Sequence, residues 1–282
     1  TKRAKAGDAR VNFDAKWGVN MAARQLYDYT RNPGEYYEMH YTALKNKYLF
    51  DGQDEMTAHL NAVNNLTGSA AVGGLGYNVY TVPEGQTLIG ANGKLNPNAT
   101  MGRKFEYNGQ EYTAKADDWY DELYDPALRQ EYNLSVAAAT EKSNFFASFG
   151  YLNNTGITDG SNMQRYTARL RADYQAKKWL KIGGNMSYTN FNWNGASSSN
   201  EGDGSTGDVF AAVGDMAPIY PVFIRDGEGN IMYEDNKAGH DYPGKKYDTK
   251  WPIYDSGDGS IWGLTRFSGA QSNPLQNIWL DE

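Results

Sequence analysis

The chain has 282 residues, a net charge of −7, 40% hydrophobic residues and no cysteine. The absence of cysteine excludes disulfides, thiolate nucleophiles and cysteine-based zinc sites, and no apolar run approaches the roughly 20 residues of a transmembrane helix. Aromatic residues reach 14%, with 22 tyrosines and 7 tryptophans, which is typical of all-β proteins whose rings lie at an interface.

The acidic charge is concentrated in one part of the chain. From 201 to 258 twelve acidic residues face five basic ones, whereas from 165 to 181 six basic residues face one acid. Nucleic-acid binding needs a basic footprint. The acidic part therefore argues against a nucleic-acid partner.

The first expected strand covers residues 9–19, where Val11, Phe13, Trp17 and Val19 alternate with polar residues. Alternation with a period of two indicates a β-strand, because successive side chains point to opposite faces.

A long irregular connection over 20–130 comes next. A helix is expected over 32–48, because Asn32 can cap it and Pro33 suits its first position. A weaker second helix is expected over 54–66. Residues 67–118 are rich in Gly, Asn and Thr and predict a loop with short hairpins.

Four more strands follow from the same alternation, over 131–140, 144–152, 165–175 and 179–190. In the last strand the parity shifts near Thr189, which brings up Phe191 and Trp193 and predicts a β-bulge. After 194 the chain is loop-like, with a possible short helix over 207–216 and a hairpin that turns on Asp226-Gly227.

The expected connections alternate in length. The turns at 140–143 and 176–178 are short, whereas the connections at 152–164, 20–130 and 194–282 are longer and fall at the other end of the strands. This asymmetry is typical of an outer-membrane barrel, with short periplasmic turns and long extracellular loops.

The span of one strand agrees with a barrel. Tyr166 and Tyr174 lie eight positions apart, which is roughly 27 Å along a strand, or roughly 20 Å of height at a tilt near 40°. On this interpretation the Tyr, Ala and Leu parity meets lipid, and the Arg, Thr and Asp parity meets a wet lumen. A soluble antiparallel sheet also alternates, but its strands average five or six residues.

Several segments resemble the SusC/RagA family, the TonB-dependent outer-membrane transporters of the Bacteroidetes. The resemblance is strong over most of the chain and weakest at 67–110 and 240–270. The segments are TKRAKAG, VNFDAKWGVN, NPGEYYE, RQEYNLSVAAATEKSNFFASFGYLNNTGI, QRYTARLRADYQAKKWLKIGGNMSYTN, MAPIYPVF, DGEGN and SNPLQN.

The resemblance implies a mainly β fold, a partial antiparallel transmembrane β-barrel with about five long strands of a barrel of roughly 22. Its long extracellular loops would contain short helices. Residues 1–8 would be the end of the plug and 9–282 the N-terminal part of the barrel, with long loops at about 20–130 and 194–282.

The resemblance also implies a function without chemistry: import of a nutrient, either a glycan oligosaccharide or a peptide, across the bacterial outer membrane. The implied partners are a SusD-like surface lipoprotein, TonB acting through segments that this chain lacks, the nutrient and outer-membrane lipid. A rival interpretation is a secreted all-β carbohydrate-binding or hydrolytic domain. A third is a passive porin-like or adhesive barrel.

Two sets of aromatic residues are candidate site residues. The first set consists of loop aromatics that could stack on a nutrient: Tyr36, Tyr37, Trp119, Tyr120 and Trp193. The second set consists of aromatics expected at the membrane interface: Trp17, Tyr166, Tyr174, Trp179 and Tyr188.

Other chemistry has weaker support. No G-x-S-x-G motif occurs, and the carboxylates around Trp119 (Asp117, Asp118, Asp121 and Glu122) fit a helix start better than a glycosidase pair. We expect no resident cofactor and no metal. Loosely bound calcium remains possible in the acidic loops 202–208 and 255–260, whereas DGEGNI at 226–231 fits a hairpin turn better than a calcium loop.

Overall fold

The computed structural model describes residues 7–22, 30–195, 213–214, 216–234, 244–248, 251–252, 264–265, 273 and 275. The chain divides into two compact units. The sheet unit comprises residues 1–24 and 124–196, and the loop unit comprises residues 25–123 and 197–282. The predictions for a helix over 207–216 and for calcium in the loops 202–208 and 255–260 fall largely or wholly outside the described residues.

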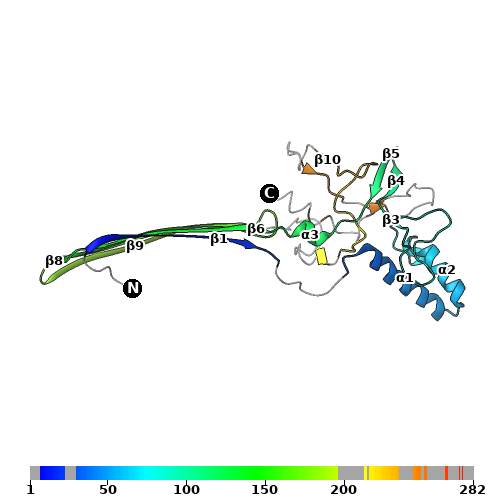
Figure 1. Cartoon of the computed structure of the whole chain (residues 1–282), viewed down its shortest axis with the longest axis horizontal. Coiled ribbons are helices and arrows are strands. Elements are labelled where there is room, and N and C mark those ends of the chain that lie inside the picture. Colours follow the sequence, from blue (N-terminus) through cyan, green and yellow to red (C-terminus); the bar gives the residue numbers. More distant parts are fainter. Residues whose placement is uncertain are drawn as a thin grey trace. The chain divides into compact units, whose positions relative to one another are not determined.

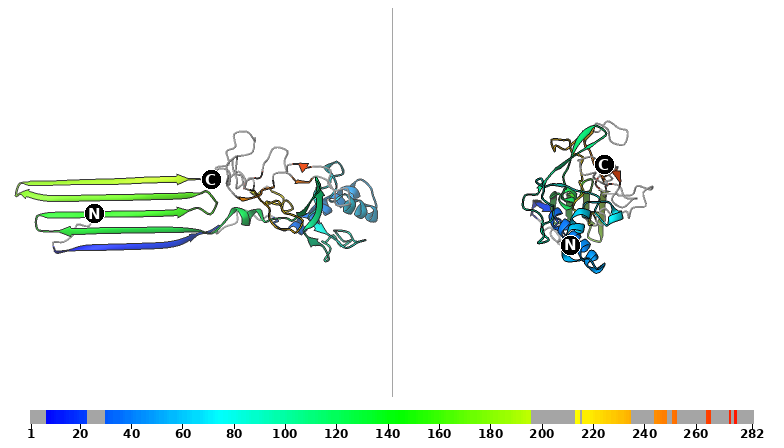
Figure 2. Two further views of the ribbon diagram at one scale, coloured as in Figure 1. Left: turned by 90° about the horizontal axis from the view of Figure 1, so that it is seen from above. Right: turned by 90° about the vertical axis from the view of Figure 1, so that its right-hand side faces the viewer.

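The sheet unit contains five long antiparallel strands that lie side by side (Figures 1 and 2). Their order in the sheet is β1-β6-β7-β8-β9, so every strand pairs with the next one of this set along the chain. The strands are β1 (Gly7–Asn20), β6 (Ala127–Ala139), β7 (Ser143–Thr155), β8 (Asn162–Lys177) and β9 (Leu180–Asn194). The predicted mainly β fold, with about five long antiparallel strands, is confirmed.

The connections between these strands also alternate in length. Residues 140–142 join β6 to β7 and residues 178–179 join β8 to β9, whereas residues 21–126 join the neighbouring strands β1 and β6. The β7–β8 connection covers only residues 156–161, because both strands extend further than the alternation predicted. Short turns therefore lie at one end of the sheet and longer connections at the other.

The register places the two parities on two faces. Phe13 lies opposite Leu134, Leu134 opposite Phe149, and Phe149 opposite Ala168. Residues directly opposite each other share a face, so this row and its i±2 neighbours form one surface, which we call the apolar face. The other surface, the polar face, carries Arg169 and its neighbours of the same parity.

The predicted bulge at Thr189 is wrong. The β8–β9 register is continuous from Asn162–Asn194 down to Gln175–Lys181, and it shifts only at the turn, between Gln175 and Lys177. Phe191 and Trp193 therefore keep the parity of Lys181 and lie on the polar face. These two large aromatic side chains thus lie among the charged and polar residues of that face.

In the loop unit, α1 (Pro33–Phe50) and α2 (Glu55–Asn65) form where the sequence predicted helices. The Oδ1 atom of Asn32 accepts a hydrogen bond from Gly34 N at 2.8 Å, and Asp54 Oδ1 accepts from Met56 N and Thr57 N. These bonds satisfy amides that have no partner within the first turn of a helix. No helix in the described part of the chain combines the length and the hydrophobicity that a membrane crossing needs.

Short elements complete the loop unit. They are η1 (Ala70–Val72), α3 (Trp119–Leu123), β2 (Tyr80–Thr81) paired with β3 (Thr100–Met101), β4 (Arg103–Tyr107) paired with β5 (Gln110–Ala114), β10 (Tyr233–Glu234) paired with β11 (Gly244–Lys245), and β12 (Trp251–Pro252) paired with β13 (Leu264–Thr265). The core of the loop unit is built around fully buried side chains from segments distant in the sequence: Tyr37, Leu66, Val79, Ile89, Ile219, Val222 and Asn273.

Candidate functional site

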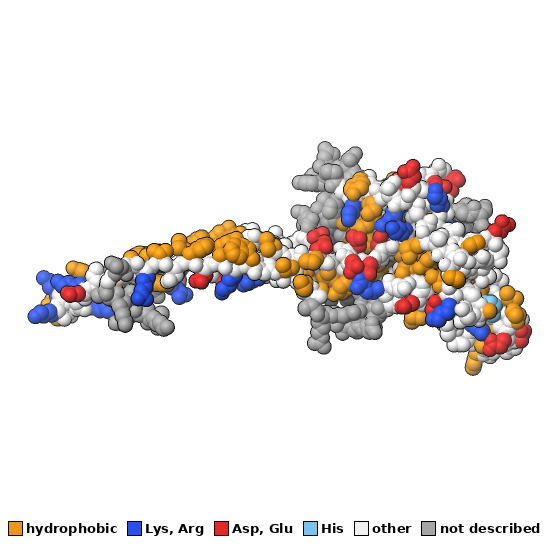
Figure 3. Space-filling model, in the orientation of Figure 1, with side chains coloured by type: hydrophobic (Ala, Val, Ile, Leu, Met, Phe, Trp, Pro, Cys, Tyr) orange, Lys and Arg blue, Asp and Glu red, His pale blue; other side chains and the backbone are white. Residues whose placement is uncertain are grey.

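The apolar face of the sheet is uncharged and exposed. Many large side chains along it are exposed, from 39% at Leu170 to 65% at Phe13. Hydrophobic side chains gather along one side of the sheet and Lys and Arg side chains along the other (Figure 3). A continuous exposed apolar surface of this size indicates contact with another apolar phase or partner.

An aromatic row crosses four strands near the end with the longer connections. Trp17 Nε1 donates to the hydroxyl of Tyr132 at 3.1 Å, and the two rings meet edge to face at 5.8 Å. Tyr132 stacks with Tyr151 at 6.3 Å, and Tyr151 packs against Tyr166 at 4.9 Å. Amphipathic rings in such a row are typical of the interface between lipid and water.

Amide side chains follow this row directly on the same face. The next positions toward the longer connections are Gln130, Asn153, Gln164 and Asn192, and Asn190 lies opposite Tyr166 on β9. Toward the other end the face is apolar as far as Tyr174 and Ile182. On β7, β8 and β9 the apolar band therefore ends in amides beyond the aromatic row, whereas on β1 and β6 it continues to the exposed pair Val19 and Leu128.

All five predicted interface aromatics are exposed in the sheet unit. Trp17, Tyr166, Tyr174 and Tyr188 lie on the apolar face, and Trp179, 82% exposed, lies in the short turn before β9. Tyr132 and Tyr151 belong to the same row but were not among the predicted residues. Their strand parity, which matches that of Leu134 and Phe149, was the signal that could have added them.

The polar face holds internal hydrogen bonds and ion pairs. Arg129 pairs with Glu131 at 2.9 Å and Arg171 with Asp173 at 3.2 Å, each between next-nearest residues on one strand. A Cβ built on Gly150 would lie 2.7 Å from the hydroxyl of Thr167, which shows how closely side chains of neighbouring strands meet here. Such a face needs water or a polar partner.

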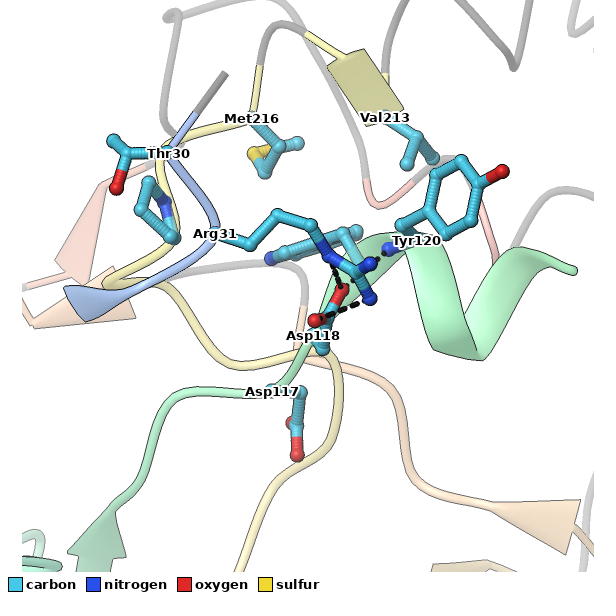
Figure 4. A pocket seen from close by; sticks show the side chains of 9 residues that line it. Thr30, Arg31, Asp117, Asp118, Tyr120, Val213 and Met216 are labelled. Carbon is cyan, nitrogen blue, oxygen red and sulfur yellow. Dashed lines mark hydrogen bonds and ion pairs between the residues drawn. The ribbon is translucent and has the colours of Figure 1, made fainter. Parts of the chain in front are cut away.

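The loop unit contains a small pocket lined by residues from three segments (Figure 4). They are Thr30, Arg31, Asp117, Asp118, Trp119, Tyr120, Val213, Met216 and Pro218. Its cavity volume is about 10 Å³, which is roughly the room that one water molecule needs. The pocket therefore does not accommodate an oligomer.

The charge in this pocket is already neutralised. The Arg31 guanidinium bonds Asp118 at 2.9 Å, pairs with Asp121, and lies 4.8 Å from the centre of the Tyr120 ring. Desolvation acts to lower the pKa of Arg31, but the hydrogen bonds and attraction of Asp118 and Asp121 outweigh it, and its pKa is raised. The arrangement joins the segment before α1 to α3.

Two of the carboxylates around Trp119, those of Asp117 and Asp118, point in different directions. Figure 4 shows Asp118 directed toward Arg31 and Asp117 directed away from it. Asp117 Oδ2 accepts from Val222 N at 2.8 Å and from Arg225 Nη1 at 3.0 Å, while Asp118 Oδ1 caps α3 through Tyr120 N. Asp118 therefore caps α3, as the helix-start interpretation expected, whereas Asp117 links the segment before α3 to residues 222–225.

Two of the predicted loop aromatics are core residues. Tyr37 is fully buried and its hydroxyl donates to Tyr77 O at 2.8 Å, while Trp119, 4% exposed, donates through Nε1 to Tyr220 O at 3.0 Å. Burial raises the pKa of Tyr37. Neither ring offers a face to a nutrient, so we do not retain these two as contact residues.

The other three loop aromatics remain accessible to different degrees. Tyr36 and Tyr120 are half-buried in the loop unit. Trp193 is 65% exposed and lies on the polar face of the sheet unit, not in a loop. The structure therefore does not bring the predicted set together into one site.

No group of three His, Asp or Glu side chains in the described part of the chain has an arrangement that could hold a metal ion. Asp226 Oδ1 accepts from Glu228 N and Asn230 N, and Gly229 has φ +90°. The 226–230 segment is therefore a hairpin turn, as expected, closed by its own backbone amides.

The fold and its two faces define a class: a mainly β chain whose long antiparallel strands, apolar on one side and polar on the other, have the form of part of a barrel wall. Comparison with known proteins narrows this class. The chain is 33% identical over 72 residues to TonB-dependent receptor P39 of Formosa agariphila, and 25% identical over 132 residues to TonB-dependent receptor P26 of the same organism. TonB-dependent receptor P3 of that organism is 26% identical over 125 residues. The predicted resemblance to TonB-dependent receptors is thereby confirmed.

The matches cover 26%, 47% and 44% of this chain but only 7%, 12% and 12% of the receptors. No protein-family model matches the chain. Among solved structures, the chain is similar to the RagAB peptide transporter, with 17% identity, a TM-score of 0.46, and coverage of 87% of this chain and 24% of that one. RagAB in the closed-closed state gives 16% identity, a TM-score of 0.47, and coverage of 98% and 24%.

Proposed function

We propose that this chain forms part of the barrel wall of a SusC/RagA-type TonB-dependent transporter in the bacterial outer membrane. The observation that carries the proposal is the uncharged, exposed apolar face with its aromatic row from Trp17 to Tyr166, which amides follow on β7, β8 and β9. The similarity to three TonB-dependent receptors supports it independently.

The energetics of the apolar face favour lipid as its partner. A charged side chain on the lipid face of a barrel costs about 2–4 kcal/mol near the bilayer midplane. The paired positions of all five strands on this face carry none. A soluble sheet of similar size has no such constraint on its outer face.

The sheet edges support the same proposal. Among the described residues, β1 and β9 pair on one side only. In a bilayer an open edge leaves backbone amides and carbonyls without partners, so each edge needs another strand of a closed barrel. The proposed transporter supplies those strands on both sides.

The proposed activity is active import of a nutrient, a glycan oligosaccharide or a peptide, with energy delivered through TonB. A SusD-like surface lipoprotein is the proposed partner at the extracellular side, where the longer connections would lie. The function needs no cofactor and no catalytic residue of this chain. The fold likeness to the RagAB peptide importer is too weak to choose between glycan and peptide.

A genetic experiment tests the proposal. The native protein is followed by membrane fractionation, and uptake is measured on a panel of oligosaccharides and peptides in wild type, in a strain deleted for this protein, and in a strain deleted for TonB. We expect the protein in the outer-membrane fraction and loss of the same uptake in both deletions. A protein recovered in the soluble fraction, or uptake independent of TonB, would contradict the proposal.

A further inference from the structure

The polar face carries an unusual cluster at the end with the longer connections. Arg165 lies between Leu152 on β7 and Phe191 on β9, each directly opposite it across a strand pair. Trp193 lies two positions beyond Phe191 and opposite Met163. Directly opposite residues have Cβ atoms roughly 4.5–5.5 Å apart, so one guanidinium and several apolar groups share a small area.

The two aromatic rings of this cluster are open to solvent. Phe191 is 57% exposed and Trp193 65% exposed. The Trp193 ring lies over Gly195, where a Cβ would come within 2.8 Å of the indole, so the absence of a side chain at 195 allows this ring position. Exposed rings on a polar face are stacking surfaces without a partner among the described residues.

The polar face also has an excess of positive charge. Its basic side chains are Arg10, Lys16, Arg129, Arg165, Arg169, Arg171 and Lys181. Its acidic side chains are Asp14, Glu131 and Asp173.

Two of the three acidic side chains form ion pairs with arginines of their own strands. Glu131 pairs with Arg129 and Asp173 with Arg171. Arg165 and Arg169 make no ion pair with any residue in the described part of the chain. Arg165 lies directly opposite Phe191 and diagonally opposite Trp193 in the register, and its guanidinium is thus available to an external anion.

We propose that Arg165, Phe191 and Trp193 form a lumenal binding site for a carboxylate next to an apolar or ring-shaped group. A carboxylate accepts two parallel hydrogen bonds from one guanidinium, and a neighbouring ring or side chain stacks on the aromatic pair. This chemistry is shared by acidic sugars and by peptides with a free C-terminal carboxylate. The inference rests on the proposed function, because only there does this face line a passage for nutrients.

The strand position favours a small ligand over an acidic protein segment. The unpaired guanidinium and the exposed rings coincide only at the end of the polar face near the longer connections. Toward the short turns, the face offers Lys181 and the paired Arg171 but no exposed large apolar side chain. A mixed cationic and aromatic surface suits a ligand that has both features within a few ångströms.

The test measures binding by titration calorimetry on the full-length native protein, extracted in detergent from the outer membrane. The probes are trigalacturonic acid and its methyl ester in one arm, and the peptide Ala-Ala-Phe-Ala and its C-terminal amide in the other. We expect at least one acid to bind, and its ester or amide to bind at least about tenfold more weakly, since a charge-assisted hydrogen bond is lost. The arm that responds identifies the source of the carboxylate.

Three variants localise the effect. Arg165→Gln should weaken binding of the acid at least about tenfold and leave the ester or amide unchanged. Trp193→Ala should weaken binding of both forms. Lys181→Gln is the matched control, because it removes the same charge from the same face roughly 33 Å away along β9, and it should change neither.

The outcomes separate the two proposals. Equal effects of Arg165→Gln and Lys181→Gln would reduce the site to general attraction and overturn it, as would failure of both acids to bind. If Arg165→Gln lowered the melting temperature without changing binding, Arg165 would pair with an acidic residue of the protein itself. That result would also overturn the proposed carboxylate site. If the protein is in the outer membrane and its uptake needs TonB, such results leave the proposed function intact.

Discussion

The ion pair between Asp117 and Arg225 is the interaction whose loss should damage the loop unit most. Both side chains are only 7% exposed, and Arg225 bonds both carboxylate oxygens, Nη2 to Oδ1 at 2.5 Å and Nη1 to Oδ2 at 3.0 Å. The same carboxylate accepts from Val222 N at 2.8 Å and Phe223 N at 3.3 Å. It therefore ties the segment before α3 to the chain leading into the 226–230 turn.

Asp117→Ala leaves a buried guanidinium whose remaining hydrogen bonds within the described part of the chain are two long ones, 3.5 Å to Lys115 O and 3.4 Å to Phe223 O. It also leaves two buried amides without an acceptor. Breaking a buried ion pair in this way costs about 3–5 kcal/mol. Since each 1.4 kcal/mol is a factor of ten, local opening should become roughly 100-fold to 4,000-fold more frequent.

Native-state hydrogen exchange of the amides at 222–225 measures this opening. Asp121→Ala is the matched control, because its carboxylate is 70% exposed and also pairs with an arginine, and an exposed pair contributes about 0–1 kcal/mol. The double variant Asp117→Ala with Arg225→Met should recover much of the loss. If Asp117→Ala changed exchange no more than Asp121→Ala, the role of this pair would be refuted.

Three further predictions concern the sheet, the first helix and pH. Leu170→Arg, in the middle of the apolar face, should lower the free energy of unfolding of the membrane-embedded protein by about 2–4 kcal/mol in urea titrations. Thr167→Arg, on the polar face, should lower it less. Equal losses in the two variants would argue against a lipid-facing surface. Asn32→Ala removes the cap on Gly34 N and should speed exchange in the first turn of α1 by the equivalent of about 1 kcal/mol, while Asn32→Asp should not. Burial raises the pKa of Tyr220 to about 12, above the unfolded value of about 10, so the folded state keeps the proton longer. The stability of the loop unit, followed by exchange-resistant amides, should hold below pH 10 and fall between pH 10 and 12. Tyr220→Phe should make that fall less steep and leave the part that comes from the buried Tyr37 and Tyr77, whose pKa values are also raised by burial.

Much of the sheet unit was predictable from the sequence, because a face that contacts one phase and a face that contacts another impose strict alternation. The alternation predicted strands that are too short, for example 144–152 where β7 covers Ser143–Thr155. At the strand ends both parities are polar, as at Asn153 and Asn154 on β7, and the alternation signal vanishes although pairing continues to Thr155. The helix over 32–48 was predictable because Asn32 and Pro33 are local signals.

The errors arose where tertiary contacts decide the outcome. Tyr37 bonds a carbonyl 40 positions away and Trp119 one 101 positions away, and nothing in their own segments shows that these rings are buried. Phe191 and Trp193 suggested a bulge because an aromatic pair was assumed to face outward. The continuous register instead leaves them on the polar face, where they become candidates for ligand binding rather than for lipid contact.

The central claim is that the apolar face of the sheet meets lipid, and accessibility scanning along β8 tests it most directly. These 282 residues contain no cysteine, and any cysteine elsewhere in the full-length protein is first replaced by serine. Single cysteines placed in turn at 167, 168, 169 and 170 then carry a spin label in the full-length protein in bilayers. The account predicts that labels at 168 and 170 collide mainly with oxygen dissolved in lipid, and labels at 167 and 169 mainly with a water-soluble nickel complex. Four labels with the same preference for the nickel complex would contradict it.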